Sequence, residues 1–68
     1  MKDVTKERTF RIELLVEHFE KEPPEFMDKI FVVARKTWPR VTDRTLMSYA
    51  ASAFHILREK NMESELHE

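Results

Sequence analysis

Apolar residues recur along this chain at the spacing of an α-helix, in three stretches that are separated by prolines. The breaks lie at the pair Pro23–Pro24 and at Pro39. No stretch alternates apolar and polar residues for long between turn residues, which is the pattern of a strand. The sequence therefore predicts an all-α fold, a small three-helix bundle with short corners near residues 22–24 and 39–41.

The first predicted helix runs from about residue 5 to residue 21, and apolar residues cover more than half of its circumference. One core-facing stripe needs less than this, so we expect the helix to contact both its own core and a partner. The candidate partner contacts are Phe10, Leu14 and Val16. The other apolar positions are Ile12, Leu15 and Phe19, and the acids on the remaining arc are Glu13, Glu17 and Glu20.

The second predicted helix begins at "EPPEF", where Pro24 suits a first turn and Glu25 complements the helix dipole. It ends near Trp38, because Pro39 lacks an amide hydrogen and disfavours helical backbone at the residue before it. We expect Trp38 to lie over the core as a lid. The predicted apolar stripe consists of Phe26, Ile30, Val33, Ala34 and Thr37.

The third predicted helix has Thr42 as its N-cap and continues to about Lys60. Val41 and Leu46 flank this cap at the spacing of a hydrophobic staple. Asp43 lies in the first turn, where negative charge is favoured. The predicted apolar stripe consists of Leu46, Ala50, Ala53, Phe54 and Leu57.

The chain has 68 residues, which predicts one domain over residues 1–62 and an acidic, frayed C-terminal tail over residues 63–68. Hydrophobic residues make up 41% and charged residues 37%, a balance typical of a soluble globular protein. No apolar run approaches the roughly 20 residues that cross a bilayer, and the N-terminus lacks the apolar core of a signal peptide. We expect a cytoplasmic protein without a membrane partner.

The composition also argues against several kinds of site. The chain contains no Gly, so it has no Gly-rich phosphate loop, and no Cys, so it has no disulfide or thiolate site. His18, His55 and His67 are far apart and show no metal-ligand spacing. No residues near His55 in the sequence supply a nucleophile and an orienting acid together. We therefore expect a protein that is not an enzyme and that binds no metal or cofactor.

Positive charge gathers at the second corner, although the net charge of the chain is only −1. The basic corner, as we call it, comprises Arg35, Lys36, Arg40 and Arg44, and Asp43 is the only acid between Arg35 and Met47. Such a corner can be a solvated surface, in which basic residues in a last helical turn simply suit the dipole. It can also be the place where a protein contacts phosphates.

The stretch from residue 30 to residue 57 resembles a helix-turn-helix DNA-binding segment. In that family an Ala packs in the first helix, and a hydrophobic–Ser/Thr–x–x–Thr–hydrophobic pattern opens the second. Ala34 matches the first feature, and "VTDRTLMSY" from Val41 to Tyr49 matches the second. The family usually has a Gly in the turn, where this chain has "TWPR" and a longer corner, so the angle between the helices stays open.

The resemblance implies a sequence-specific double-stranded DNA-binding protein, usually a dimer, that acts as a transcriptional regulator and uses the third helix for recognition. The homodimer contact would then be made by the first helix. The alternative is a non-enzymatic protein-interaction module that docks on a larger partner through the same apolar face. The candidate DNA contacts are Arg35, Lys36, Arg40, Thr42, Arg44, Thr45, Ser48, Ser52 and His55.

Overall fold

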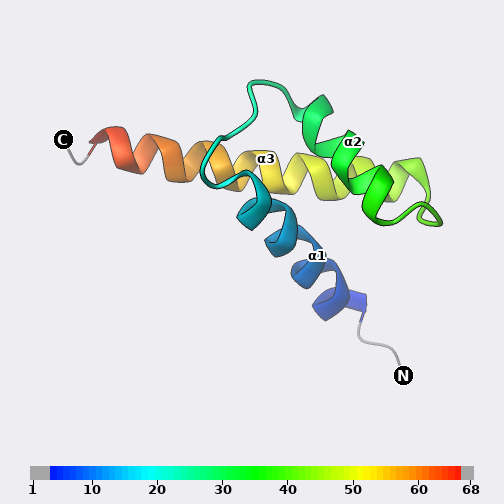
Figure 1. Ribbon diagram of the computed structural model, residues 1–68. Helices are drawn as coiled ribbons and strands as arrows, with labels where there is room; N and C mark the ends of the chain where they lie inside the picture. The colour runs from blue at the N-terminus through cyan, green and yellow to red at the C-terminus, as the bar shows by residue number, and fades with distance from the viewer. Residues whose placement is uncertain (1–3, 67–68) are drawn as a thin grey trace.

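The computed structural model describes the backbone of residues 4–66 and the side chains of residues 6–60. It contains three helices, α1 (Val4–Phe19), α2 (Met27–Thr37) and α3 (Asp43–Leu66). The predicted all-α three-helix bundle is therefore confirmed. The longest helix, α3, contacts both of the others, whereas α1 and α2 contact each other only slightly. The helix α2 lies across the N-terminal part of α3, and α1 meets α3 near its middle (Figure 1).

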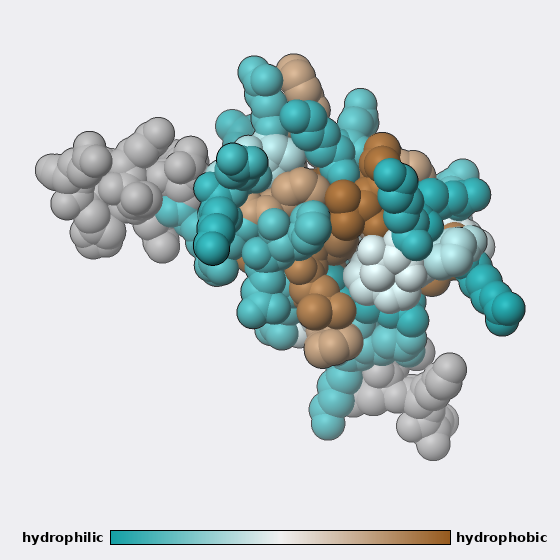
Figure 2. All heavy atoms as spheres, in the orientation of Figure 1, coloured by the Kyte–Doolittle hydropathy of each residue, from teal (hydrophilic) through white to brown (hydrophobic). Residues whose placement is uncertain are grey.

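The core lies where α1 and α2 cover α3. Three alanines, Ala34 of α2 and Ala50 and Ala53 of α3, have no exposed surface, so the backbones of these two helices approach closely. Figure 2 shows the apolar atoms gathered between the helices in the middle of the viewed face, with hydrophilic side chains around them. The core residues are Ile12, Leu15, Val16, Ile30, Ala34, Leu46, Tyr49, Ala50, Ala53 and Leu57.

The structure of the second corner agrees closely with the prediction from the sequence. The helix α2 ends at Thr37, and Trp38, directly before Pro39, is its C-cap, whose amide donates to the Ala34 carbonyl at 2.8 Å. The Thr42 hydroxyl accepts from the amide of Thr45 at 3.4 Å, which is the hydrogen bond of an N-cap. The predicted stop and the predicted cap are both confirmed. No residue in the described part of the chain has a positive φ, so the corner turns without left-handed backbone.

The predicted placement of Val41 and Leu46 on either side of the cap is also confirmed. Leu46 is fully buried, and Val41 packs against the core from just outside the helix. Trp38, predicted as a lid, is half-buried against the same core.

The first connection corrects the predicted start of the second helix. Phe26 was expected on the buried stripe, but its backbone is extended (φ −129°, ψ 146°), and its side chain is 63% exposed. The chain leaves α1 beside Lys60, where Glu20 pairs with that lysine, and must travel back along α3 before α2 begins. Extended backbone covers about 3.3 Å per residue against about 1.5 Å in a helix, so extended backbone before α2 lets this short connection reach farther.

The far end of α3 also differs from the prediction. The helical backbone continues to Leu66, beyond the predicted end near Lys60. Neither Gly nor Pro follows Lys60, and the residues there are mostly good helix formers, so no sequence signal stops the helix. Residues 67 and 68 of the predicted tail, with His67, lie outside the described residues.

Candidate nucleic-acid interface

Positive and negative charges are divided along the chain more strongly than the net charge reveals. Between Lys29 and Arg58, six cations face one acid, Asp43, so this part of the chain carries +5, while the remainder carries −6. The cations are Lys29, Arg35, Lys36, Arg40, Arg44 and Arg58. The excess lies on α2 beyond Asp28, the second corner and the first four turns of α3. With Asp28 counted these elements carry +4, so the end of the molecule at the second corner is basic.

Asp43 offsets part of the basic corner. It forms an ion pair with Arg35 across the junction of α2 and α3, and both side chains are largely exposed. The other three members, Lys36, Arg40 and Arg44, are exposed. Among residues 6–60 no acidic side chain pairs with any of these three cations. The accessible positive charge of the corner therefore comes from Lys36, Arg40 and Arg44.

The two threonines at the start of α3 engage each other. Thr42 accepts from the Thr45 amide and donates its own hydroxyl hydrogen to Thr45 Oγ1 at 3.0 Å. Thr42 therefore acts mainly as a cap. The Thr45 hydroxyl accepts this hydrogen bond and keeps its own hydrogen for a contact outside the helix.

The serines of α3 have a partner that the sequence did not reveal. Arg8 of α1 donates to Ser48 Oγ at 2.8 Å and to Ser52 Oγ at 3.2 Å. Each serine accepts here, so each hydroxyl hydrogen remains available to a further acceptor. The result is a cation from α1 beside two hydroxyl donors from α3, an arrangement suited to phosphate oxygens.

Sequence reasoning missed Arg8 because it lies 40 and 44 residues from the two serines. A signal was nevertheless present. Arg8 precedes Ile12 by four positions and Leu15 by seven, so it lies on the core-facing side of α1. A cation on that side, one turn before the first buried residue, must extend past the core to the neighbouring helix.

A second arginine of α1 was also missed. Arg11 pairs with Glu7, and its guanidinium lies 5.4 Å from the Trp38 ring centroid and 5.9 Å from the Tyr49 ring centroid. The two rings meet edge to face at 6.0 Å. This cluster joins α1, the second corner and α3, so Arg11 has a structural role at the border of the basic end.

The candidate contact farthest along α3 lies in a different electrostatic setting. His55 is exposed, and its Nε2 atom lies 3.0 Å from Glu59 Oε1. This acid limits the basic surface, which therefore occupies the N-terminal half of α3. Among the described residues, no three histidine or acidic side chains are close enough to hold a metal ion.

The candidate partner contacts of α1 divide into two groups. Phe10 is 60% exposed and Leu14 is 39% exposed, so both are open to a partner. Val16 is buried in the core, because it lies on the side of α1 that faces α3. Only its edge reaches the surface, where it lines a groove of about 490 Å³ with the other two residues.

Comparisons with known proteins gave no match: no family model, no curated protein and no solved structure is similar to this chain. No helix in the described part of the chain is long and apolar enough to cross a membrane. The function must therefore be argued from the residues of the chain itself.

Proposed function

We propose that this protein binds double-stranded DNA through the N-terminal half of α3 and the basic corner. The observation that carries the proposal is the set of exposed cations Lys36, Arg40 and Arg44, which have no acidic partner among residues 6–60. Phosphate contacts by Lys and Arg supply much of the affinity of DNA-binding proteins, and they need cations whose charge is not already matched.

The outward face of α3 has the side-chain sizes that the proposal requires. Arg44, Ser48 and Ala51 are exposed and follow one another along the helix, about one turn apart. Because Ser48 and Ala51 are small, the helix can approach the floor of a major groove. Arg44 would pair with a guanine edge or a phosphate, and the hydroxyls would donate to phosphates or bases.

Arg8 enlarges this surface beyond what the helix-turn-helix resemblance implied. Its guanidinium already lies against Ser48 and Ser52, so its position relative to α3 is set before DNA is bound. Preorganised donors lose less conformational entropy on binding. We therefore add Arg8 to the candidate contacts and place His55, with its acidic neighbour Glu59, at the limit of the interface.

Salt dependence tests the proposal. If Arg8, Lys36, Arg40 and Arg44 each neutralise one phosphate, the logarithm of the binding constant should fall against log salt with a slope of about −3 to −4. Replacing Arg40 and Arg44 together with Ala removes two contacts. The slope should then become less steep by about 2, and affinity for duplex DNA should fall, as measured by fluorescence anisotropy between about 50 and 200 mM salt.

The matched control replaces Lys21 and Lys60 with Ala, which changes the net charge equally at exposed sites outside the basic part of the chain. Its slope should stay close to that of the unmodified protein. The proposal is wrong if the unmodified protein shows no salt-dependent duplex binding. Equal binding by the corner variant and the control variant would also contradict it, since the location of the charge would then be irrelevant.

A further inference from the structure

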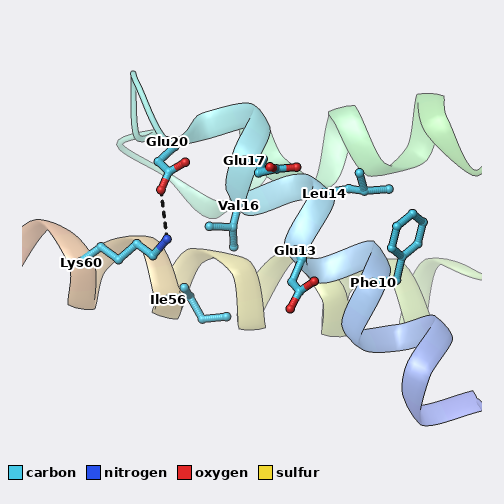
Figure 3. A pocket seen from close by; sticks show the side chains of 8 residues that line it. All are labelled: Phe10, Glu13, Leu14, Val16, Glu17, Glu20, Ile56 and Lys60. Atoms are coloured by element: carbon cyan, nitrogen blue, oxygen red, sulfur yellow. Dashed lines mark hydrogen bonds and ion pairs between the residues drawn. The ribbon is translucent and has the colours of Figure 1, made fainter.

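A groove with an apolar floor and an acidic rim lies between α1 and α3, away from the basic corner (Figure 3). Val16 points from α1 toward α3, and Ile56 lines the groove from α3. Glu20 and Lys60 close one end of it with an ion pair of 3.0 Å. We call this the acidic groove, and it is lined by Phe10, Glu13, Leu14, Val16, Glu17, Glu20, Ile56 and Lys60.

Two features of the acidic groove, its unpaired carboxylates and an exposed apolar ridge, indicate what kind of surface would fit it. Glu13 and Glu17 are exposed one turn apart, and no cation of residues 6–60 pairs with either carboxylate. Phe10 and Leu14, also one turn apart, give an exposed apolar ridge beside them. A matching surface therefore needs an exposed apolar side chain flanked by cations.

The chain carries such a surface on its own α2. Lys29, Val32 and Lys36 follow at intervals of three and four residues, so they lie on one face of the helix. Both lysines are exposed, and Val32, although apolar, is 50% exposed. This face points away from the core that Ile30 and Ala34 form on the other side of α2.

We propose that the acidic groove of one copy of this chain binds the Lys29–Val32–Lys36 face of α2 of a second copy, head to tail. Val32 would lie against Phe10 and Leu14, and the lysines would lie against Glu13 and Glu17. A two-fold contact of α1 with α1 would instead bring the same carboxylates of both copies together, and like charges at close range oppose association. The charge pattern thus replaces the expected α1–α1 homodimer with an asymmetric contact.

The geometry of the two faces is compatible with this contact. Glu13 and Glu17 are about 6 Å apart along the axis of α1, and Lys29 and Lys36 are about 10.5 Å apart along α2. Long lysine side chains cover this difference. Since a head-to-tail contact leaves one free groove and one free α2 face, copies can continue to add. The contact is small, so self-association should appear only at high protein concentration and low salt.

Charge exchange between two variants tests the proposal. The groove variant carries Glu13→Lys and Glu17→Lys, and the α2 variant carries Lys29→Glu and Val32→Glu. In the groove variant alone, the groove and the α2 face are both basic, and in the α2 variant alone they are both acidic. In either case like charges repel, so the dissociation constant of self-association should rise about tenfold or more. When the two are mixed, the unchanged groove of the α2 variant can bind the unchanged α2 face of the groove variant, so association should return to near the original strength. Sedimentation velocity up to about 1 mM protein measures both effects.

The control variant, Glu22→Lys with Glu25→Lys, makes the same charge change as the groove variant at exposed sites in the first connection. It should associate as the unmodified protein does. In ¹H–¹⁵N spectra of the unmodified protein, rising concentration should shift two separate sets of amides, one around Leu14 and Glu17 and one around Lys29 and Val32. An α1–α1 dimer would shift only the first set.

Three outcomes would overturn the proposal. The first is that the unmodified protein stays at 8.2 kDa at about 1 mM in low salt. The second is that the groove variant associates as strongly as the control variant. The third is that the mixture of the groove variant and the α2 variant does not regain association. The first outcome would leave the groove to a different protein. Neither the groove variant nor the α2 variant changes Lys36 or another member of the basic corner. The test of self-association is therefore separate from the test of DNA binding.

Discussion

Arg8 and Arg11 show how much a single long side chain adds to a small domain. Each leaves α1, passes the apolar core and reaches hydroxyl or aromatic groups about 40 residues away in the chain. Their methylene stems cover apolar surface while their guanidinium groups stay near water. The two arginines therefore connect α1 to α3 along the edge of the core, and they lie beside the proposed DNA surface.

Thr42 offers a test of capping against ligand contact. Its hydroxyl accepts from the Thr45 amide, so Thr42→Ala leaves a helix amide without its partner and should lower the free energy of unfolding by about 1 kcal/mol. Thr42→Ser keeps the hydroxyl and should lose much less. Urea unfolding followed by circular dichroism measures both. A loss of DNA affinity with unchanged stability would show instead that this hydroxyl serves the ligand and not the helix.

At the scale of elements, local signals determined the second corner almost completely. Pro39 stops α2, Thr42 caps α3, and Val41 and Leu46 pack across the cap, as sequence reasoning predicted. These features depend on residues within a few positions of one another. Helical periodicity also separated the exposed Phe10 and Leu14 of α1 from its core face, but Val16, predicted as a partner contact, is buried in the core.

Where the prediction failed, the cause lay in contacts distant in sequence. Phe26 was assigned to a buried stripe, but it lies in the connection that leads from α1 back along α3, with extended backbone and an exposed side chain. Of the candidate site, the exposed cations were predictable from the charge pattern. The pairing of Arg35 with Asp43 and the placement of Arg8 against Ser48 depend on how helices pack, which single-sequence periodicity does not specify.

Leu46 connects the corner to the core and should be the most sensitive position of α3. Its side chain is fully buried, so Leu46→Ala should lower the free energy of unfolding by about 2–5 kcal/mol. A domain of this size has a total of roughly 3–10 kcal/mol, and the variant should be partly unfolded at 37 °C. Its neighbour is the control: Met47 is 42% exposed, and Met47→Ala should cost less than about 1 kcal/mol. Equal losses in thermal or urea unfolding would contradict this account of the core.

At the scale of the whole molecule, one core serves all three helices, and α3 is the element that the other two share. Neither α1 nor α2 buries its apolar face without α3, because they contact each other only slightly. The molecule is also electrically divided, with the basic corner at one end and the acidic groove on the flank of α1. The two proposed binding surfaces therefore lie on separate parts of one small molecule.

Trp38 should report the unfolding of the entire molecule. Its ring contacts Arg11 of α1 and Tyr49 of α3 from its place directly after α2. Because a single core joins these elements, Trp38 fluorescence and helical circular dichroism should give the same urea midpoint within error. A fluorescence transition at clearly lower urea would mean that the second corner opens while the helices persist, and would contradict a single cooperative unit.

The second corner turns without any positive φ, in a chain that contains no glycine. At every described position the backbone therefore avoids the left-handed conformations that favour glycine. Proline excepted, a systematic substitution scan of this protein would test side chains alone, free of the backbone penalties that complicate such scans at glycine turns. Loss of binding at a corner residue could then be attributed to its charge or its hydrogen bonds.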